Sequence, residues 1–160
     1  MKAGRLVMFA VVAALSGASE TSSAIRKGPN PGSDRERLIG AWRLVSMVVP
    51  RPNGNPMSIT QPIGMLIYTR DGHMSVQLMY PKSANAQANE YVQEGYEASF
   101  GSYEVDEATH TVTHHVHGSI TRDLLVGKDL PRAYQFSPDG HLTLKSARPD
   151  EQWAVTWEHY

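Results

Sequence analysis

Cysteine does not occur in the 160 residues of the chain. Its absence excludes a disulfide framework, a thiolate zinc site and a cysteine nucleophile. A surplus of positive charge is also missing, because the formal net charge is -1 and Lys and Arg form no basic stripe, which argues against nucleic-acid binding. The sequence contains no nucleophile elbow, phosphate-binding glycine loop or Rossmann fingerprint. What remains is a chain long enough for one domain with a workable core.

The first 24 residues have the features of a secretory signal peptide in the right order. Lys2 and Arg5 form a positive start, residues 6–15 are an uninterrupted apolar run, and small residues follow. The run is too short to span a bilayer and long enough for a signal peptide. The alternative is an apolar helix that stays on the domain. We expect a secreted or periplasmic protein, with no membrane span in the mature chain.

Residues 25–37 are polar and rich in Gly and Pro, which predicts a disordered linker that ends in a short turn of helix around residues 34–39. The folded domain should occupy residues 38–160, where apolar and polar side chains alternate with the period of half-buried strands. Asp-Gly pairs at 71–72 and 139–140 are strong hairpin signals. These patterns predict eight strands, at residues 40–49, 63–69, 73–80, 100–105, 111–119, 130–136, 141–146 and 152–159.

Two segments between the predicted strands lack this alternation. Residues 50–62 contain four prolines and therefore predict a loop, either at a binding mouth or as a disordered surface loop. Residues 83–99 place Tyr91, Val92 and Tyr96 at helical spacing, with glutamates on the other side, which predicts one amphipathic helix. Eight strands in hairpin order remove their edges by closing into an antiparallel up-and-down barrel, and a two-sheet sandwich is the alternative. The predicted fold class is all-β, with this one helix inserted.

Four sequence blocks occur in an order that is typical of one protein family. Residues 40–46 read GAWRLVS, residues 64–79 read GMLIYTRDGHMSVQLM, residues 100–116 contain FGSYEVDE and TVTHHV, and residues 155–158 read VTWE. From residue 38 to the C-terminus the chain thereby resembles the lipocalin-like domain family of bacteria and fungi. The resemblance implies a lipocalin-like barrel whose interior holds packed side chains or one small ligand. It also implies that Trp42 plugs the closed end of that barrel.

The chain departs from the family pattern at several places. His73 stands where the family usually has Tyr, His117 stands where it usually has Glu, and the Asn-Trp that is usual after residue 119 is missing. If these positions touch a ligand, the specificity of this chain should differ from that of its relatives. Some members stand among natural-product biosynthesis enzymes, so the resemblance also implies an isomerase or cyclase as an alternative.

His115 and His117 share one face of a predicted strand. Their spacing could bind a metal, but the further ligands that a metal-binding cupin needs are missing from the sequence. A solvated outer face is the interpretation that we favour, and we expect no metal.

His114 lies on the opposite face of that strand, with Val112 and Val116 as apolar neighbours, and should point inward. A buried imidazole needs a hydrogen-bond partner, which Tyr103 or Gln77 could provide. His114 would then be a polar anchor for a ligand, a general acid or base, or a satisfied core histidine.

Aromatic side chains with polar tips could clamp and orient a flat or apolar ligand, or could simply fill the core. Arg132 shares a strand face with Leu130 and Tyr134, where it could pair with a ligand carboxylate or lie outward. The candidate ligand-binding residues are Tyr68, Gln77, Tyr103, His114, Arg132, Tyr134 and Trp157.

The sequence supports three hypotheses about function. The leading one is binding of a small, mainly apolar or aromatic ligand inside the barrel, without a cofactor. The alternatives are a cofactor-free isomerase or cyclase that acts on a natural-product-like substrate with His114 as acid or base, and an interaction module with a filled barrel. A cavity of roughly several hundred Å³ with His114 in its wall would exclude the filled barrel.

Overall fold

The structure is a computed structural model that describes residues 32–50, 55–59, 61–82 and 88–160. The expected signal peptide and most of the expected linker lie outside these residues. Among the described residues, no helix combines the length and the apolar character needed to cross a membrane. The elements in chain order are α1 (Asp34–Leu38), β1 (Gly40–Pro50), β2 (Pro56–Ile59), β3 (Ile63–Tyr68), β4 (His73–Met79), β5 (Tyr96–Asp106), β6 (Thr111–Ser119), η2 (Asp123–Leu125), β7 (Asp129–Phe136), β8 (Leu142–Ser146) and β9 (Ala154–His159).

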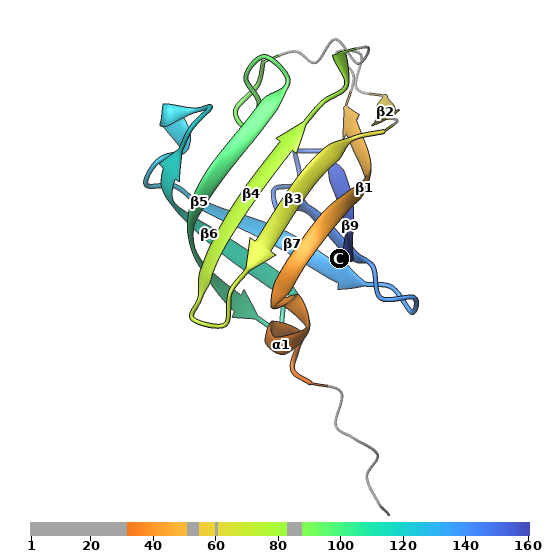
Figure 1. The fold of residues 1–160 in the computed structure, drawn as a ribbon, viewed down its shortest axis with the longest axis vertical. Helices are drawn as coiled ribbons and strands as arrows, with labels where there is room; N and C mark the ends of the chain where they lie inside the picture. Colours follow the sequence, from red (N-terminus) through yellow and green to blue (C-terminus); the bar gives the residue numbers. More distant parts are fainter. Residues whose placement is uncertain (1–31, 51–54, 60, 83–87) are drawn as a thin grey trace, which may run out of the picture. The chain divides into compact units, whose positions relative to one another are not determined.

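Eight of the strands form a closed antiparallel barrel (Figure 1). β1 pairs with β3, the ladder continues in chain order to β9, and β9 pairs back with β1, where Leu44 lies opposite Trp157. Closure gives each strand of the ring a neighbour on both sides, which is why strands in hairpin order favour it. The predicted all-β up-and-down barrel is confirmed.

Alternation along each strand decides which side chains fill the barrel. In β6, Val112, His114 and Val116 are buried, whereas His115 is half-buried and His117 is exposed. Because successive side chains of a strand point to opposite faces, the buried set shares the inner face. His114 therefore points inward, and the two other histidines face outward, as the period of two predicts.

The amphipathic helix predicted at residues 83–99 is wrong for the residues of this segment that the structure describes. Residues 88–95 form turns and irregular structure, and β5 begins at Tyr96. Gly95 has a φ of +83°, a left-handed conformation that a right-handed α-helix does not contain. From Tyr96 to Ser102 the backbone of β5 pairs with β4. These ladder hydrogen bonds continue the barrel, so the tertiary pairing outweighs the helical spacing of a few apolar residues.

Residues 50–62, which are predicted as a loop, contain the short strand β2. It pairs only with the end of β1, where Val48 lies opposite Ser58. β2 begins at Pro56, and proline fits an edge strand because one side of such a strand needs no ladder hydrogen bonds. The prolines therefore exclude a central strand here, as predicted, without excluding a strand.

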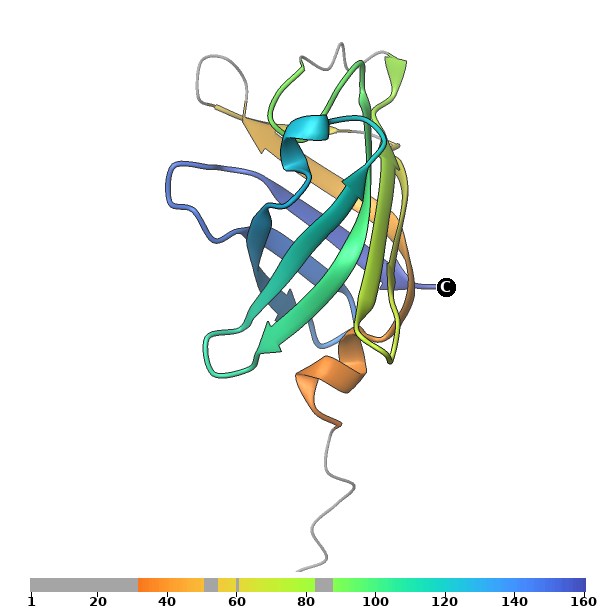
Figure 2. The same ribbon diagram turned by 90° about the vertical axis from the view of Figure 1, so that its left-hand side faces the viewer.

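The short helix α1 covers one end of the barrel (Figure 2). Leu38 is fully buried, and the Nε1–H of Trp42 donates to the carbonyl oxygen of Leu38 at 2.8 Å. The hydroxyl of Tyr134 donates to Oδ2 of Asp34 at 3.0 Å. Trp42 fills this closed end, as the family resemblance implies, and the helical turn predicted near residues 34–39 is present.

Candidate ligand-binding cavity

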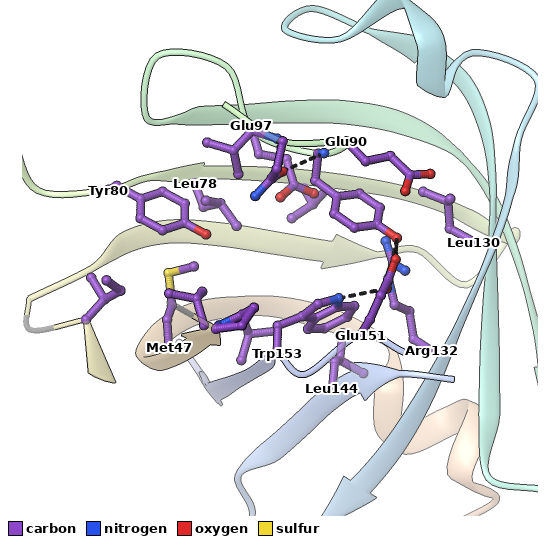
Figure 3. Close-up of a pocket in the computed structure, with 18 of the residues that line it drawn as sticks. Met47, Leu78, Tyr80, Glu90, Glu97, Leu130, Arg132, Leu144, Glu151 and Trp153 are labelled. Atoms are coloured by element: carbon purple, nitrogen blue, oxygen red, sulfur yellow. Dashed lines mark hydrogen bonds between the residues drawn. The ribbon is translucent and has the colours of Figure 1, made fainter. Parts of the chain in front are cut away.

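The barrel contains a cavity of about 830 Å³. It extends to the end opposite α1, where residues 89–92 and 150–153 line it (Figure 1). Leu78 and Glu97 lie on one side of the cavity, and Met47 and Trp153 lie on the other (Figure 3). The strands contribute a largely apolar wall that includes Met47, Leu66, Val76, Leu78, Leu130, Leu144 and Val155. The interior of the barrel is therefore not completely filled by side chains, and His114 lies in the wall of the cavity.

His114, in the cavity wall, forms a buried pair with Tyr68, which lies outside the lining. The hydroxyl oxygen of Tyr68 and Nε2 of His114 are 2.6 Å apart, and both side chains are almost completely buried. Burial, with a smaller contribution from the positive charge of Arg132, lowers the pKa of His114 to about 3, so its ring is neutral at neutral pH. Burial raises the pKa of Tyr68, whose hydroxyl therefore keeps its proton.

The pair favours one of the two neutral tautomers of His114. No other described residue accepts a hydrogen bond from the hydroxyl of Tyr68, so the arrangement that satisfies its proton is the one in which it donates to Nε2. The remaining proton is then on Nδ1, and no described residue accepts a hydrogen bond from it. His114, which lines the cavity, can therefore offer one N–H donor to a ligand.

The partner of His114 differs from the two that the sequence suggests. Tyr103 lies opposite His114 in the ladder, but its hydroxyl donates to the carbonyl oxygen of Thr69 at 2.9 Å. Gln77 is exposed, because its neighbours in β4 take the inward positions and the strand has a period of two. Tyr68 comes from the end of β3 and reaches His114 across the interior of the barrel.

Arg132 places a positive charge in the cavity wall. Its side chain comes from β7, and the residue is only 6% exposed. The guanidinium carbon lies 4.9 Å from the ring centroid of Tyr91 and 4.8 Å from that of Trp153. Both distances are within the range of cation–π attraction. Arg132 therefore points inward, and the option that it lies on the outer face is wrong.

A network of polar side chains joins the two segments that line the open end. The hydroxyl of Tyr91 and the Nε1–H of Trp153 both donate to the carboxylate of Glu151, at 3.1 and 3.0 Å. Arg148 forms ion pairs with Glu151 and with Glu90. Figure 3 shows Glu151 between Trp153 and Arg132. The negative charge of Glu151 is thus balanced by Arg148.

Glu97 is a second carboxyl group in the cavity wall. Burial raises its pKa to about 7, against the opposing effect of the positive charge on Arg132. It is therefore partly protonated at neutral pH. The cavity thus combines apolar walls with a neutral imidazole, a guanidinium and a carboxyl group that titrates near neutrality.

A comparison with models of protein families assigns the chain to a family. Residues 39–159 match the model described as a lipocalin-like domain. The chain belongs to the lipocalin-like domain family. A comparison with curated proteins finds no match for this lipocalin-like domain. In the part of the domain that the structure describes, no group of three or more His, Asp or Glu side chains could hold a metal ion.

The structure separates the seven predicted ligand-binding residues of the lipocalin-like domain into three groups. His114, Arg132 and Trp157 line the cavity. Tyr68, Tyr103 and Tyr134 are buried and hydrogen-bonded outside the cavity lining, and Gln77 lies on the outer surface. The three tyrosines stabilise the barrel rather than line its cavity, because each hydroxyl already has a protein partner.

Sequence reasoning missed most of the residues that line the cavity, among them Tyr91, Glu97 and Trp153. Tyr91 and Glu97 fall in the segment that was assigned to a helix, which puts Glu97 on a solvated face. If the segment is treated as a strand with a period of two, Glu97 lies on the same face as Ser99 and Tyr103, which are both buried. That alternation is the signal that identifies Glu97 as inward-facing. For Tyr91 and Trp153, which lie outside the strands, the sequence gives no comparable signal.

Proposed function

We propose that this lipocalin-like domain binds one small, mainly apolar ligand inside its barrel. The observation that carries the proposal is the cavity of about 830 Å³ with apolar walls and a few polar groups. Its volume lies in the range of roughly 300–1,000 Å³ that is typical of small-molecule sites. Burial of apolar ligand surface supplies the affinity, and the polar groups orient the ligand.

His114 suits the role of an anchor better than the role of a catalytic acid or base. With a pKa of about 3, its imidazole is a weak base and carries no acidic second proton at neutral pH. Its Nδ1–H can nevertheless donate a hydrogen bond to a ligand oxygen. The properties of His114 therefore favour ligand binding over the isomerase or cyclase alternative.

The test compares two substitutions on one strand. One places a large side chain in the cavity, and the other places the same side chain on the outer surface, and the effect of each on ligand binding is measured. Val76 lines the cavity, and the next residue, Gln77, is exposed on the same strand. We expect the neutral fluorescent probe N-phenylnaphthylamine to bind the wild-type protein with one site. Val76→Trp should weaken that binding about tenfold, whereas Gln77→Trp should leave it unchanged. Circular dichroism checks that both variants keep the β-sheet spectrum.

Two results would overturn the proposal. The first is that the wild-type protein does not bind the probe and that native mass spectrometry finds no co-purifying small molecule bound to it. The other is probe binding that both tryptophan variants weaken equally, or that neither weakens, since the probe would then sit on the outer surface.

We also propose that the domain acts outside the cytoplasm. The support is the order of charge, apolar run and small residues in the first 24 residues. An intact-mass measurement on protein from its own host should show that these residues have been removed. A mass that still includes Met1 would contradict export by this route.

A further inference from the structure

The side chain of Arg132 is buried, and its guanidinium has no close carboxylate among the described residues. The residue is 6% exposed, and no described residue forms a hydrogen bond or an ion pair with its guanidinium. Its contacts with Tyr91 and Trp153 use aromatic rings, which are only weak acceptors for its N–H groups. A buried guanidinium normally has a carboxylate or another acceptor on its planar set of donors. The donors of Arg132 are therefore available to a ligand.

The nearby carboxyl groups do not take this place. Glu151 is held by Arg148 and by hydrogen bonds from Tyr91 and Trp153. Glu97 lies in the same cavity, but it forms no ion pair with Arg132. Its raised pKa of about 7 also keeps it partly neutral. Glu97 therefore balances the positive charge of Arg132 only in part.

The aromatic contacts of Arg132 do not enclose its guanidinium. The ring centroids of Tyr91 and Trp153 are 6.2 Å apart. If the rings lay on opposite sides of the guanidinium, this separation would be close to the sum of the two distances, 4.9 and 4.8 Å. The rings therefore do not lie on opposite sides of it. Because Arg132 also lines the cavity, the part of its guanidinium that the rings do not cover can face a ligand.

A second donor lies on the neighbouring strand. In the ladder between β6 and β7, Arg132 is opposite Val112 and His114 is opposite Leu130. Arg132 and His114 are therefore diagonal neighbours on the inner face, and both line the cavity. The Nδ1–H of His114 and the N–H groups of Arg132 are both suited to oxygen acceptors.

We infer that the ligand is a monocarboxylic acid with an apolar body, and that its carboxylate binds Arg132. This inference rests on the proposed function, because it requires that the cavity takes a ligand. The planar guanidinium matches a carboxylate through two parallel hydrogen bonds, and the apolar wall takes the hydrocarbon part. The experiment described next tests whether the hydrocarbon part of the ligand is aliphatic or aromatic.

The test compares pairs of ligands that differ only in the head group. One pair is dodecanoate and dodecanol, and the other is naphthoate and naphthalenemethanol. Binding is measured by calorimetry near pH 6, where the carboxylates are ionised and Glu97 is largely protonated. In at least one pair the wild-type protein should prefer the acid by about tenfold or more. Arg132→Met should abolish this preference and keep the affinity for the alcohol.

A control variant shows whether the effect belongs to the cavity. Arg43 lies on the outer face of β1, where it pairs with Glu158, so Arg43→Met should leave the preference for the acid unchanged. Equal affinity of the wild-type protein for acid and alcohol in both pairs would overturn the inference while the proposed function stands. A preference that survives Arg132→Met would do the same. Failure of all four ligands to bind would count against the proposed function itself. The wild-type comparison needs no variant, so it decides the inference even if Arg132→Met fails to fold.

Discussion

The carboxyl group of Glu97 makes the stability of the barrel depend on pH. Its pKa rises from the ordinary value of 4.5 to about 7, chiefly because burial in the cavity wall removes water from the charged form. Between these two pH values the unfolded chain loses the proton that the folded chain retains. A group with a raised folded-state pKa contributes its full stability below pH 4.5 and loses it as the pH rises through about 7.

The size of the effect follows from the two pKa values. The difference between 4.5 and about 7, at about 1.36 kcal/mol per pKa unit, corresponds to at most about 3 kcal/mol of unfolding free energy. Glu97→Gln removes the titrating group and keeps a side chain of similar size. The free energy of unfolding of Glu97→Gln minus that of the wild type should therefore rise by up to this amount between about pH 4 and about pH 8.

Urea denaturation followed by tryptophan fluorescence measures this difference, since Trp42 and Trp157 are buried in the folded domain. Taking the difference between variant and wild type cancels the titration of all other groups. Glu104→Gln is the matched control, because Glu104 lies on the same strand and its side chain is 83% exposed. A difference for Glu97→Gln that stays constant from acid to neutral pH would refute the reasoning.

Three further predictions concern the interior and one strand pairing. Tyr68→Phe should lower the free energy of unfolding by about 1–3 kcal/mol, because Nε2 of His114 would be buried without a partner; unchanged urea denaturation would contradict this. The ring NMR signals of His114 should not shift between about pH 8 and about pH 5, since its pKa is about 3, and a midpoint near 6.5 would argue against a buried neutral ring. Gly101→Ala should lower the free energy of unfolding by at least about 2 kcal/mol, because a β-carbon there would overlap the carbonyl oxygen of His115. If the variant unfolded at the same temperature as the wild-type protein, the two strands could move apart at no cost in stability, which would contradict this prediction.

Most of the barrel could be predicted from local patterns in the sequence. The alternation around His114 identifies the inner face of β6, and the Asp-Gly pairs join β3 to β4 and β7 to β8 as expected. The segment before Tyr96 could not be assigned in this way. Its apolar residues fit a helical spacing, and only the pairing of β5 with β4, which continues the closed ladder, makes it a strand.

The members of the cavity could be predicted only in part. The period of two shows that His114 and Trp157 point inward, and both line the cavity. It does not show that Tyr68 reaches His114 across the barrel, or that two rings from separate loops meet Arg132. These contacts join residues far apart in the chain.

The sequence by itself determined most of the strands of the barrel, their order and, along those strands, the face on which most side chains lie. These properties depend on neighbours a few residues apart, through the alternation of a strand and the chemistry of tight turns. The tertiary structure alone decided which inward side chains meet. That outcome depends on the closure of β9 onto β1 and on the register of every pair between them, so the buried Arg132, which has no ion pair with another described residue, becomes visible only in the closed barrel.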